Sequence, residues 1–259
     1  MTFETLEFEQ TGPVVTITLN RPEAANGMND TLTRELAEAA QAADNPAVKV
    51  VVLTGAGRFF CAGGDLKAMA ASPLGPGPFV KGIADDLHRA ISIFARMDAV
   101  VITAVNGVAA GAGFSLAVSG DLVLASDKAS FTMAYTRAGL SPDGSASYYL
   151  PRLIGVRRTQ ELMLTNRTLS AAEALEWGLI NEVVAADALS RRVTELTGQI
   201  ASGAKNSGAA VKKLVLASFG NDLETQMALE ATLIAENADG VDGKEGIDAF
   251  LNKRAPKFA

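Results

Sequence analysis

Cysteine, histidine and tryptophan are almost absent from this chain of 259 residues, which contains one of each. The single cysteine, Cys61, cannot form an internal disulfide, and such low cysteine usage fits a reducing compartment. One histidine and one cysteine cannot supply the clustered side chains that zinc and related metals require. The sequence therefore predicts neither a disulfide framework nor a metal site.

Positive charge is also scarce. The chain has 23 lysines and arginines against 29 aspartates and glutamates, and no segment is basic throughout, so we expect no nucleic-acid partner. Residues 1–4 lack the basic and apolar regions of a signal peptide, which predicts a cytoplasmic protein. The longest apolar stretch, 99–118, contains Asn106 and several glycines and begins like a strand, so we expect no membrane span.

Several fingerprints of catalysis or nucleotide binding are missing as well. The chain has no Walker A sequence, and no Gly-x-Gly-x-x-Gly follows a predicted strand. No Gly-x-Ser-x-Gly elbow accompanies His88, so nothing beyond that histidine suggests a serine triad. The two sharp nucleotide-binding fingerprints therefore do not apply, and a Ser-His-Asp triad stays open on His88 alone.

What the chain does contain is an alternation of strand-like and helix-like segments through its first half. This pattern is typical of parallel strands joined by crossover helices, and it predicts an α/β fold. We expect a core over 1–195 and a helical region over 196–259. Residues 72–78, rich in proline and glycine, predict a mobile loop. The expected elements include strands over 14–19, 48–54, 100–103 and 122–125, a helix capped by Asn29 or Asp30, a helix over 80–96 and a capping box at Ser170 and Glu173.

Two glycine-rich segments follow predicted strands. Residues 107–113 hold only glycine and alanine apart from Val108, and they lead into a small-residue helix over 114–118. Such a turn lets a ligand approach the backbone closely and leaves N–H groups free where the helix starts. The turn is interpreted either as an oxyanion-holding turn or as a tightly packed strand–helix corner.

The second glycine-rich segment, 55–64, precedes a short helix over 65–69. Ligands of parallel sheets gather beyond the carboxyl ends of the strands, so both segments should lie at that edge. Two turns whose N–H groups face one point would polarise a carbonyl group. The chemistry that benefits is stabilisation of an enolate or a tetrahedral oxyanion.

Residues 59–66 together with 106–116 resemble the crotonase superfamily, the enoyl-CoA hydratase/isomerase group. Segments 20–23, 174–180 and 253–258 are similar to that family too, so the resemblance covers essentially the whole chain. It implies a spiral of ββα units with a C-terminal helical trimerisation region. It also implies homotrimers or dimers of trimers, and an acyl-CoA thioester as the substrate, with coenzyme A a part of that substrate and no separate cofactor.

The resemblance also implies site residues. It places the oxyanion-hole donors at the backbone N–H groups of Gly64 and Ala112. We expect coenzyme A to be held mainly by backbone near Ala24 and Ala25 and over residues 62–66. The implied substrate-binding residues are Ala24, Ala25, Ala62, Gly63, Asp65, Leu66, Gly111, Ser115 and Tyr135.

The chain departs from the hydratases of the family at two positions. Those enzymes use two glutamates to add water across a double bond, and the matching residues here are Ser115 and Tyr135. A hydroxyl group is a poor general base at neutral pH, so plain hydration is not expected. Asp143 remains, in a Pro-Asp-Gly segment that resembles the isomerases of phenylacetate degradation and Δ3,Δ2-enoyl-CoA isomerases. This resemblance implies an enoyl-CoA isomerase in which Asp143 moves a proton.

Other interpretations stay open. Asp143 and His88 also match the catalytic aspartate and histidine of 4-chlorobenzoyl-CoA dehalogenase, where the aspartate attacks the aromatic ring and the histidine activates water. An enoyl-CoA hydratase with unrecognised groups and a non-catalytic acyl-CoA binder are further alternatives. Each residue has a structural interpretation too: Asp143 as a helix N-cap, His88 and Ser115 as packing residues, and Tyr135 as a cavity wall.

Overall fold

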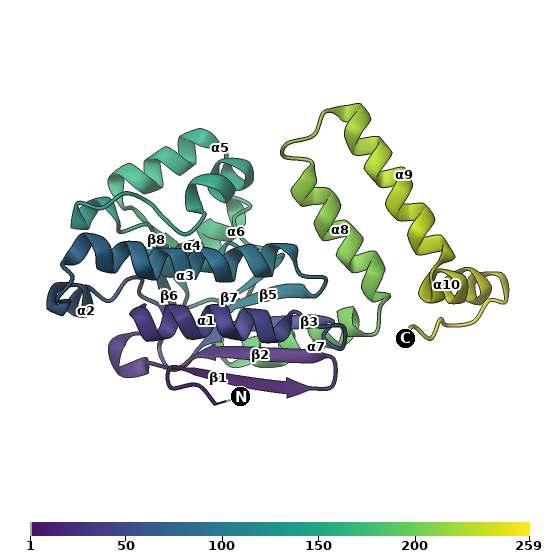
Figure 1. Cartoon of the computed structure of the whole chain (residues 1–259), viewed down its shortest axis with the longest axis horizontal. Helices are drawn as coiled ribbons and strands as arrows, with labels where there is room; N and C mark the ends of the chain where they lie inside the picture. The colour runs from purple at the N-terminus through teal and green to yellow at the C-terminus, as the bar shows by residue number, and fades with distance from the viewer. Residues whose placement is uncertain (1) are drawn as a thin grey trace.

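The computed structural model describes residues 2–259, and its core consists of two sheets wound into a spiral (Figure 1). The larger sheet has the strand order β1-β2-β3-β5-β7-β10, and the smaller one has the order β4-β6-β8-β9. Strands β3, β5 and β7 of the large sheet are each followed by a strand of the small sheet, as a ββα spiral requires. The strands are β1 (Leu6–Thr11), β2 (Val14–Leu19), β3 (Val50–Gly55), β4 (Phe59–Cys61), β5 (Val100–Val105), β6 (Val108–Ala110), β7 (Leu122–Ser126), β8 (Ser130–Thr132), β9 (Thr168–Ser170) and β10 (Glu182–Val184).

The predicted alternation of strands and crossover helices is confirmed. Strands β2, β3, β5, β7 and β10 run parallel, and only the hairpin partner β1 is antiparallel in the large sheet. In the small sheet β4, β6 and β8 are parallel, and β9 is antiparallel to β8. The carboxyl ends of the parallel strands in each sheet therefore lie at a common edge.

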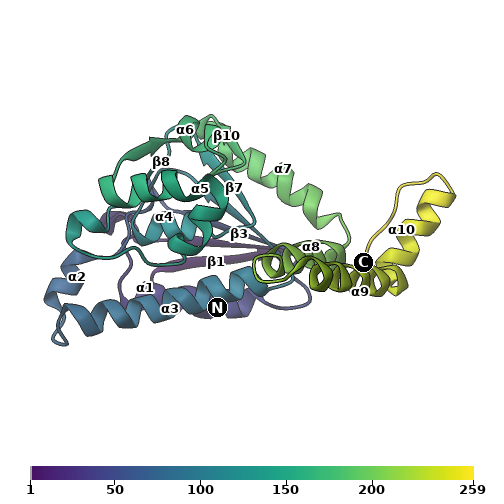
Figure 2. The same cartoon turned by 90° about the horizontal axis from the view of Figure 1, so that it is seen from above.

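Helices cover both faces of the large sheet, and the alternation of side chains along β3 shows why. Val51 and Leu53 belong to the core cluster that includes α1 (Asp30–Ala43) and α3 (Pro76–Arg96). Val50 and Val52 belong to a second cluster with α7 (Leu189–Ala201). Figure 2 shows α1 and α3 on one side of the sheet and α7 on the other. A strand buried on both faces needs a continuous apolar run, which the sequence of β3 supplies.

The helix boundaries follow local capping chemistry. Asn29 caps α1 by accepting a hydrogen bond from the N–H of Leu32 at 3.0 Å, as predicted. The predicted capping box of Ser170 and Glu173 begins α6. The remaining helices are α2 (Leu66–Ala71), α4 (Ala112–Ala117), α5 (Ala146–Thr165), α6 (Ala171–Glu176), α8 (Lys205–Ala217), α9 (Leu223–Asp239) and α10 (Val241–Leu251), with single 3-10 turns at Pro22–Ala24, Thr136–Ala138 and Ala186–Ala188.

The prediction that residues 72–78 lack regular structure is wrong for their second half. Helix α3 begins at Pro76, so Pro76, Gly77 and Pro78 form its first turn. Prolines are tolerated there because the first N–H groups of a helix have no partner within the helix. Gly75, with φ of 80°, ends the preceding turn and serves as the N-cap.

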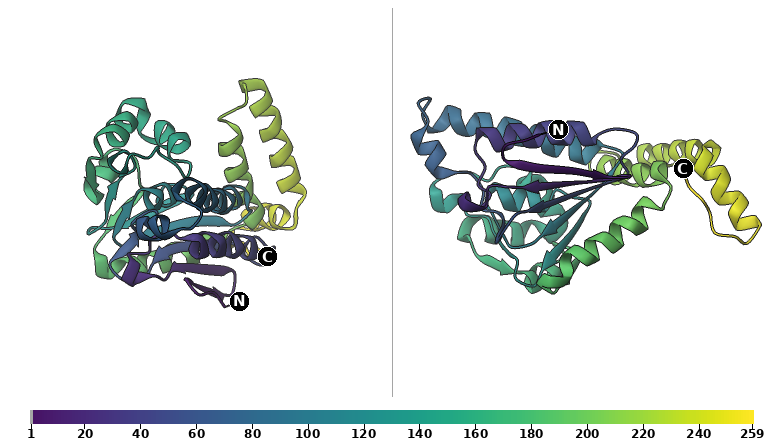
Figure 3. Two further views of the ribbon diagram at one scale, coloured as in Figure 1. Left: turned by 60° about the vertical axis from the view of Figure 1, so that its left-hand side comes forward. Right: turned by 90° about the horizontal axis from the view of Figure 1, so that it is seen from below.

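The expected boundary at residue 195 falls within helix α7, which packs on the sheet. Helix α8 lies beside the core, and α9 and α10 project away from it (Figures 1 and 3). The Lys212 ammonium fixes α8 to the core. It donates to the carbonyl oxygens of Phe94 at 2.9 Å and Ala99 at 2.6 Å, and it pairs with Asp121 at 2.8 Å. Within residues 2–259, no helix combines the length and the hydropathy that crossing a membrane would need.

Candidate active site

A cavity of about 620 Å³ opens beyond the carboxyl ends of the small sheet's parallel strands. Three successive segments that follow β4, β6 and β8 form its floor, and helices α2 and α3 form its wall. Both glycine-rich segments therefore reach the carboxyl edge of parallel strands, as predicted. The floor residues are Ala62, Gly63, Gly64, Gly111, Ala112, Ala134 and Tyr135.

The two glycine-rich turns lie against each other because their glycines leave no side chain between them. A Cβ atom at Gly113 would lie 2.1 Å from the carbonyl oxygen of Cys61, and one at Gly63 would lie 2.8 Å from that of Ala110. Gly63 also has φ of 94°, a conformation that L-residues with side chains rarely adopt. The turns thus form a packed corner, as one of the two interpretations predicted.

The same corner leaves two N–H groups without protein acceptors. In residues 2–259, neither the N–H of Gly64 nor that of Ala112 donates a hydrogen bond, although Asp65 and Gly111 beside them both do. Gly64 and Ala112 both line the cavity. The packed-corner and oxyanion-turn interpretations are therefore compatible, since the packing brings the two free donors to one cavity.

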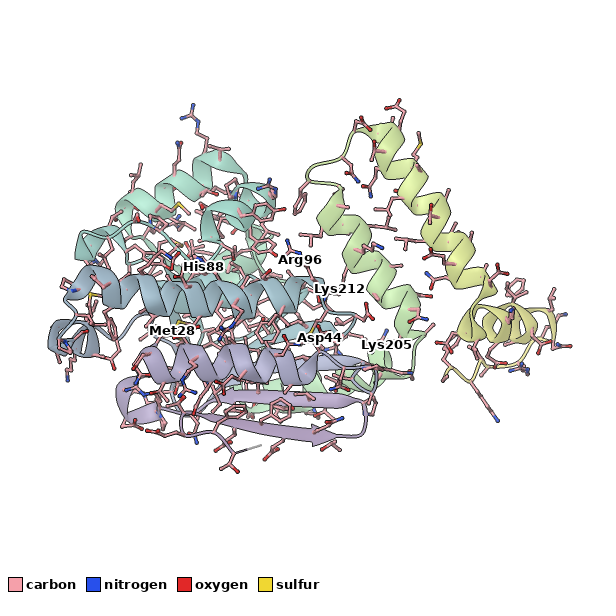
Figure 4. The ribbon with its side chains drawn as sticks, viewed as in Figure 1. Met28, Asp44, His88, Arg96, Lys205 and Lys212 are labelled. Atoms are coloured by element: carbon pink, nitrogen blue, oxygen red, sulfur yellow. The ribbon has the colours of Figure 1, made fainter. Side chains whose placement is uncertain are left out.

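Asp143 and His88 meet at the cavity wall. The Asp143 Oδ1 atom lies 2.7 Å from Nε2 of His88, a residue that precedes it by 55 positions and lies on α3 (Figure 4). The side chains are 33% and 49% exposed, so both are open to the cavity. Oδ2 of Asp143 has no hydrogen-bond partner among residues 2–259. One carboxylate oxygen is therefore held, and the other is free to exchange a proton with a ligand.

The structure contradicts the alternative in which Asp143 is only a helix cap. Helix α5 begins at Ala146, its N-cap is Ser145, and no side chain caps it. Gly144 and Ser145, which lie between Asp143 and the helix, both have positive φ. The Asp143 carboxylate contacts His88 and accepts from no N–H group at the start of α5.

Two hydroxyl groups lie behind Asp143. Oγ of Ser115, on α4, donates to the carbonyl oxygen of Asp143 at 2.7 Å, and the hydroxyl of Tyr135 donates to the same oxygen at 3.1 Å. Ser115 is fully buried and does not line the cavity. Tyr135 does line it, and burial raises the pKa of its hydroxyl, which stays protonated at neutral pH.

Comparison with known proteins places this chain in a family. A family model described as "Enoyl-CoA hydratase/isomerase" matches residues 9–259. This chain belongs to that family. The resemblance read from the two glycine-rich motifs is therefore confirmed, and so is the fold that it implied.

Individual members of the enoyl-CoA hydratase/isomerase family are similar over their full length. The chain is 38% identical to 1,2-epoxyphenylacetyl-CoA isomerase of Escherichia coli (strain K12), over 95% of this chain and 94% of that protein. It is also 38% identical to a probable enoyl-CoA hydratase of Rhodobacter capsulatus, over 100% of this chain and 99% of that one. The crystal structure of an enoyl-CoA hydratase from Polaromonas sp. JS666 matches with a TM-score of 0.93 and 35% identity, over 98% and 99% of the two chains. These relatives include an isomerase and hydratases, so family membership leaves the reaction open.

The other expected substrate-binding residues of this family member divide into two groups. Ala62, Gly63, Leu66 and Gly111 line the cavity together with the expected oxyanion donors. Ala24, Ala25 and Asp65 lie outside the cavity lining. The carbonyl of Ala25 accepts from the N–H of Ala62 at 3.0 Å, so Ala25 supports the backbone of the glycine-rich turn.

Asp65 has a structural role in this arrangement. Its carboxylate caps α2 by accepting from the N–H groups of Lys67 and Ala68, and it pairs with Arg21 at 3.2 Å. Burial alone would raise the pKa of Asp65, but the hydrogen bonds and the Arg21 charge outweigh it and lower the pKa. The carboxylate stays ionised and fixes the first turn of α2 beside the oxyanion donors.

Sequence reasoning missed most of the cavity wall. Of the predicted loop 72–78 only Gly77 lines the cavity, and no residue of α8 to α10 does. The main apolar wall residues are Met69, Ile83, Leu87 and Leu140. The apolar spacing of Ile83 and Leu87 along α3 was the available signal, since it marks the face turned toward the core.

The sole cysteine is part of the corner and has no exposed surface. Cys61 is fully buried, and its thiol donates to the carbonyl oxygen of Asn26 at 3.0 Å. Burial raises the pKa of the thiol to about 12. Cys61 is therefore an unreactive packing residue in the folded protein.

Proposed function

We propose that this protein is an enoyl-CoA isomerase that shifts a double bond by a proton shuttle on Asp143. The carrying observation is one carboxylate, held through Oδ1 and free at Oδ2, in the same cavity as two unpaired backbone N–H groups. The 38% identity to an isomerase supports this choice within the family.

The thioester carbonyl oxygen would accept hydrogen bonds from the N–H groups of Gly64 and Ala112. These donors stabilise the negative charge that the oxygen gains when the neighbouring carbon loses a proton. In a 3-enoyl-CoA, Asp143 takes the proton from C2, and the electron pair of that C–H bond enters the dienolate. Asp143 then returns the proton to C4, which leaves the double bond conjugated with the thioester and the carboxylate ionised again.

A one-base shuttle fits the groups that line the cavity. Asp85 is the other carboxylate on the wall, but it forms an ion pair with Lys81 on the outer part of α3. His88 orients Asp143 and does not take up the transferred proton. Hydration by two carboxylates is less well supported, because Ser115 and Tyr135 hold the Asp143 carbonyl instead of facing a water molecule.

The test is the absorbance of the conjugated enoyl-CoA that forms when the purified protein meets a 3-enoyl-CoA. Asp143→Asn should lower the rate by about 10²- to 10⁴-fold, the usual contribution of a general acid–base group. Binding of a saturated acyl-CoA should be unchanged. Asp85→Asn is the matched control, because it removes the other carboxylate of the wall and should keep near wild-type activity.

Two outcomes would count against this proposal. If the wild type turns over no enoyl-CoA but binds acyl-CoA esters, the protein is a non-catalytic binder. If Asp143→Asn keeps wild-type turnover, another group is the base, as the hydratase alternative requires.

A second candidate is hydrolysis of a halogenated aromatic acyl-CoA, with Asp143 as the nucleophile and His88 activating water. The 2.7 Å contact between His88 Nε2 and Asp143 Oδ1 favours it, because both groups would then serve one reaction centre. The measurement is chloride release from 4-chlorobenzoyl-CoA. Release that depends on both Asp143 and His88 would replace the isomerase proposal.

We also propose that the protein self-associates through its C-terminal helices, as a homotrimer or a dimer of trimers. Helices α9 and α10 each bury a single residue within the chain, Leu233 and Ala249. Large apolar side chains on α8 to α10 and on the turn between α8 and α9 remain exposed, and an exposed set of this size typically marks a contact surface. They are Val211, Val215, Phe219, Leu223, Met227, Ile234, Val241, Ile247, Phe250 and Leu251.

A further inference from the structure

The segment that carries Asp143 has little backbone support of its own. Between Leu140 and Ser145 the chain forms no helix or strand. The carbonyl oxygen of Asp143 accepts from the N–H of Ala146 only at 3.4 Å, a long hydrogen bond. Something other than secondary structure must fix the position of the Asp143 backbone relative to the oxyanion donors.

Two hydroxyl groups supply that support. Oγ of Ser115 lies 2.7 Å from the Asp143 carbonyl oxygen, the Tyr135 hydroxyl lies 3.1 Å from it, and the two hydroxyl oxygens lie 3.1 Å apart. A carbonyl oxygen can only accept, and it has two lone pairs. Both hydroxyl groups can therefore donate to the same carbonyl oxygen. In that case neither hydroxyl donates to the other across the 3.1 Å that separates them.

The position of Ser115 links this support to the oxyanion hole. Ser115 lies on the first turn of α4, three residues after Ala112, and its N–H donates to the carbonyl of Gly111 at 3.1 Å. One short helix thus carries an oxyanion donor and a hydroxyl that holds the base. The distance between the acid–base group and the polarised carbonyl is set through this single helix.

Close packing makes the contact sensitive to the size of residue 115. A Cβ atom at Gly144 would lie 2.9 Å from Cβ of Ser115, so the Asp143–Gly144 backbone rests directly on this serine. A longer side chain at 115 would occupy the space that the backbone fills. Serine is small enough to allow the approach and still offers a donor.

We propose that Ser115 and Tyr135 are positioning residues that hold the Asp143 main chain. In this position Oδ1 of Asp143 contacts His88, and Oδ2 is open to the cavity. This inference rests on the proposed proton shuttle. Neither hydroxyl touches the transferred proton. Ser115 is the stronger of the two, because it is fully buried and its hydrogen bond is shorter.

The kinetic test compares Ser115→Ala and Tyr135→Phe with the wild type on a 3-enoyl-CoA. A displacement of about 1 Å can cost about 10²-fold in rate, so kcat should fall about 100-fold in Ser115→Ala and about 10-fold in Tyr135→Phe. KM should change by less than about 3-fold, since substrate binding does not use these hydroxyls. Ser119→Ala is the matched control: it removes a buried hydroxyl that donates to Leu116 at 2.9 Å and does not touch Asp143.

A second measurement reads the position of Asp143 without any turnover. His88 is the only histidine of the chain, so its imidazole gives a single set of NMR resonances. Asp143→Asn provides the reference for a lost carboxylate contact. Ser115→Ala should move the His88 resonances toward that reference, whereas Ser119→Ala should leave them in place.

The results separate this inference from the proposed function. If kcat in both variants stays within about 3-fold of the wild type, or if only KM rises, the positioning role is overturned. Unchanged His88 resonances in Ser115→Ala overturn it too, even if no enoyl-CoA is turned over. Should Ser115→Ala fail to fold, Tyr135→Phe carries the test, because it removes one oxygen atom from a residue at the cavity wall.

Discussion

The sheet core and the C-terminal helices differ in how far they bury their apolar side chains. Helix α1 buries eight of its fourteen residues against the sheet and α3, whereas α9 and α10 bury one residue each. Ile234 on α9 is 71% exposed, and Phe250 on α10 is 83% exposed. The core is complete within one chain, while the tail has the composition of a core without a partner surface. Under the proposed self-association, folding and assembly would depend on different segments.

Lys212 joins the two regions, so removing it should have the largest effect. Burial lowers the pKa of Lys212, and burial raises that of Asp121, although their mutual attraction opposes both changes. Lys212→Ala would leave Asp121 and two carbonyl groups without their shared donor. The free energy of unfolding should fall by about 3–5 kcal/mol, because two buried carbonyl groups lose their donor and each unsatisfied buried group costs about 1–3 kcal/mol. Urea unfolding measures it, with the exposed neighbour Lys213→Ala as the control.

Equal unfolding midpoints for Lys212→Ala and Lys213→Ala would contradict the prediction that Lys212 attaches the C-terminal helices to the core. Apolar packing and the hydrogen bonds from Lys205 to the carbonyl oxygens of Asn45 and Pro46 would then be enough to attach the tail. A reduced midpoint with an unchanged core signal would instead show that α8 detaches before the sheet unfolds.

The second prediction concerns the exposed apolar residues of the tail. A charge placed at a buried contact should weaken association by about 2–4 kcal/mol, so Ile234→Asp and Phe250→Asp should dissociate the assembly. Analytical ultracentrifugation should then give a mass near 26.9 kDa in place of about three or six times that value. Leu74→Asp, at a residue 70% exposed on the core, is the control and should leave the mass unchanged. A wild type that already sediments as one chain would contradict the proposed assembly.

The third and smallest prediction tests how the core holds a buried charge. Burial alone would raise the pKa of Glu35, but hydrogen bonds from the N–H groups of Glu4 and Thr5 and from the Thr5 hydroxyl lower it. A carboxyl group with a lowered pKa stabilises the fold above its unfolded pKa and loses that contribution as the pH falls through its folded pKa. Glu35→Gln should cost about 1–2 kcal/mol at neutral pH.

The stabilisation that Glu35 provides should decrease as the pH falls. The difference in unfolding free energy between wild type and Glu35→Gln should be constant from pH 7 to about 5.5 and shrink below about 4.5. A difference that stays constant down to pH 3 would show that Glu35 contributes through packing and not through its charge.

Local signals carried most of the fold. The Asn29 cap, the Ser170–Glu173 capping box and the apolar run of β3 each act within a few residues, and each was predicted. The start of α3 was missed because two prolines and two glycines normally mark a loop. Here Gly75 is the N-cap and Pro76, Gly77 and Pro78 form the first turn, where N–H groups need no partner within the helix, so these residues begin a helix instead of interrupting one.

The candidate site was less accessible from sequence patterns alone. The turn at 107–113 showed that backbone groups could be free, but the approach of Gly63 to Ala110 depends on the packing of two sheets. The contact of His88 with Asp143 joins residues 55 positions apart, and only the family resemblance brought them together in advance. The double contact on the Asp143 carbonyl was not foreseen, because no spacing rule links Ser115 and Tyr135 to a main-chain atom.

Because Cys61 is buried, labelling of its thiol can report local opening of the protein. A thiol whose pKa is about 12 contains almost no thiolate at neutral pH, and no solvent reaches it in the folded state. An alkylating reagent can therefore react only when the corner formed by the two glycine-rich turns separates. The rate at which one label is incorporated, followed by mass spectrometry, would measure how often this corner opens.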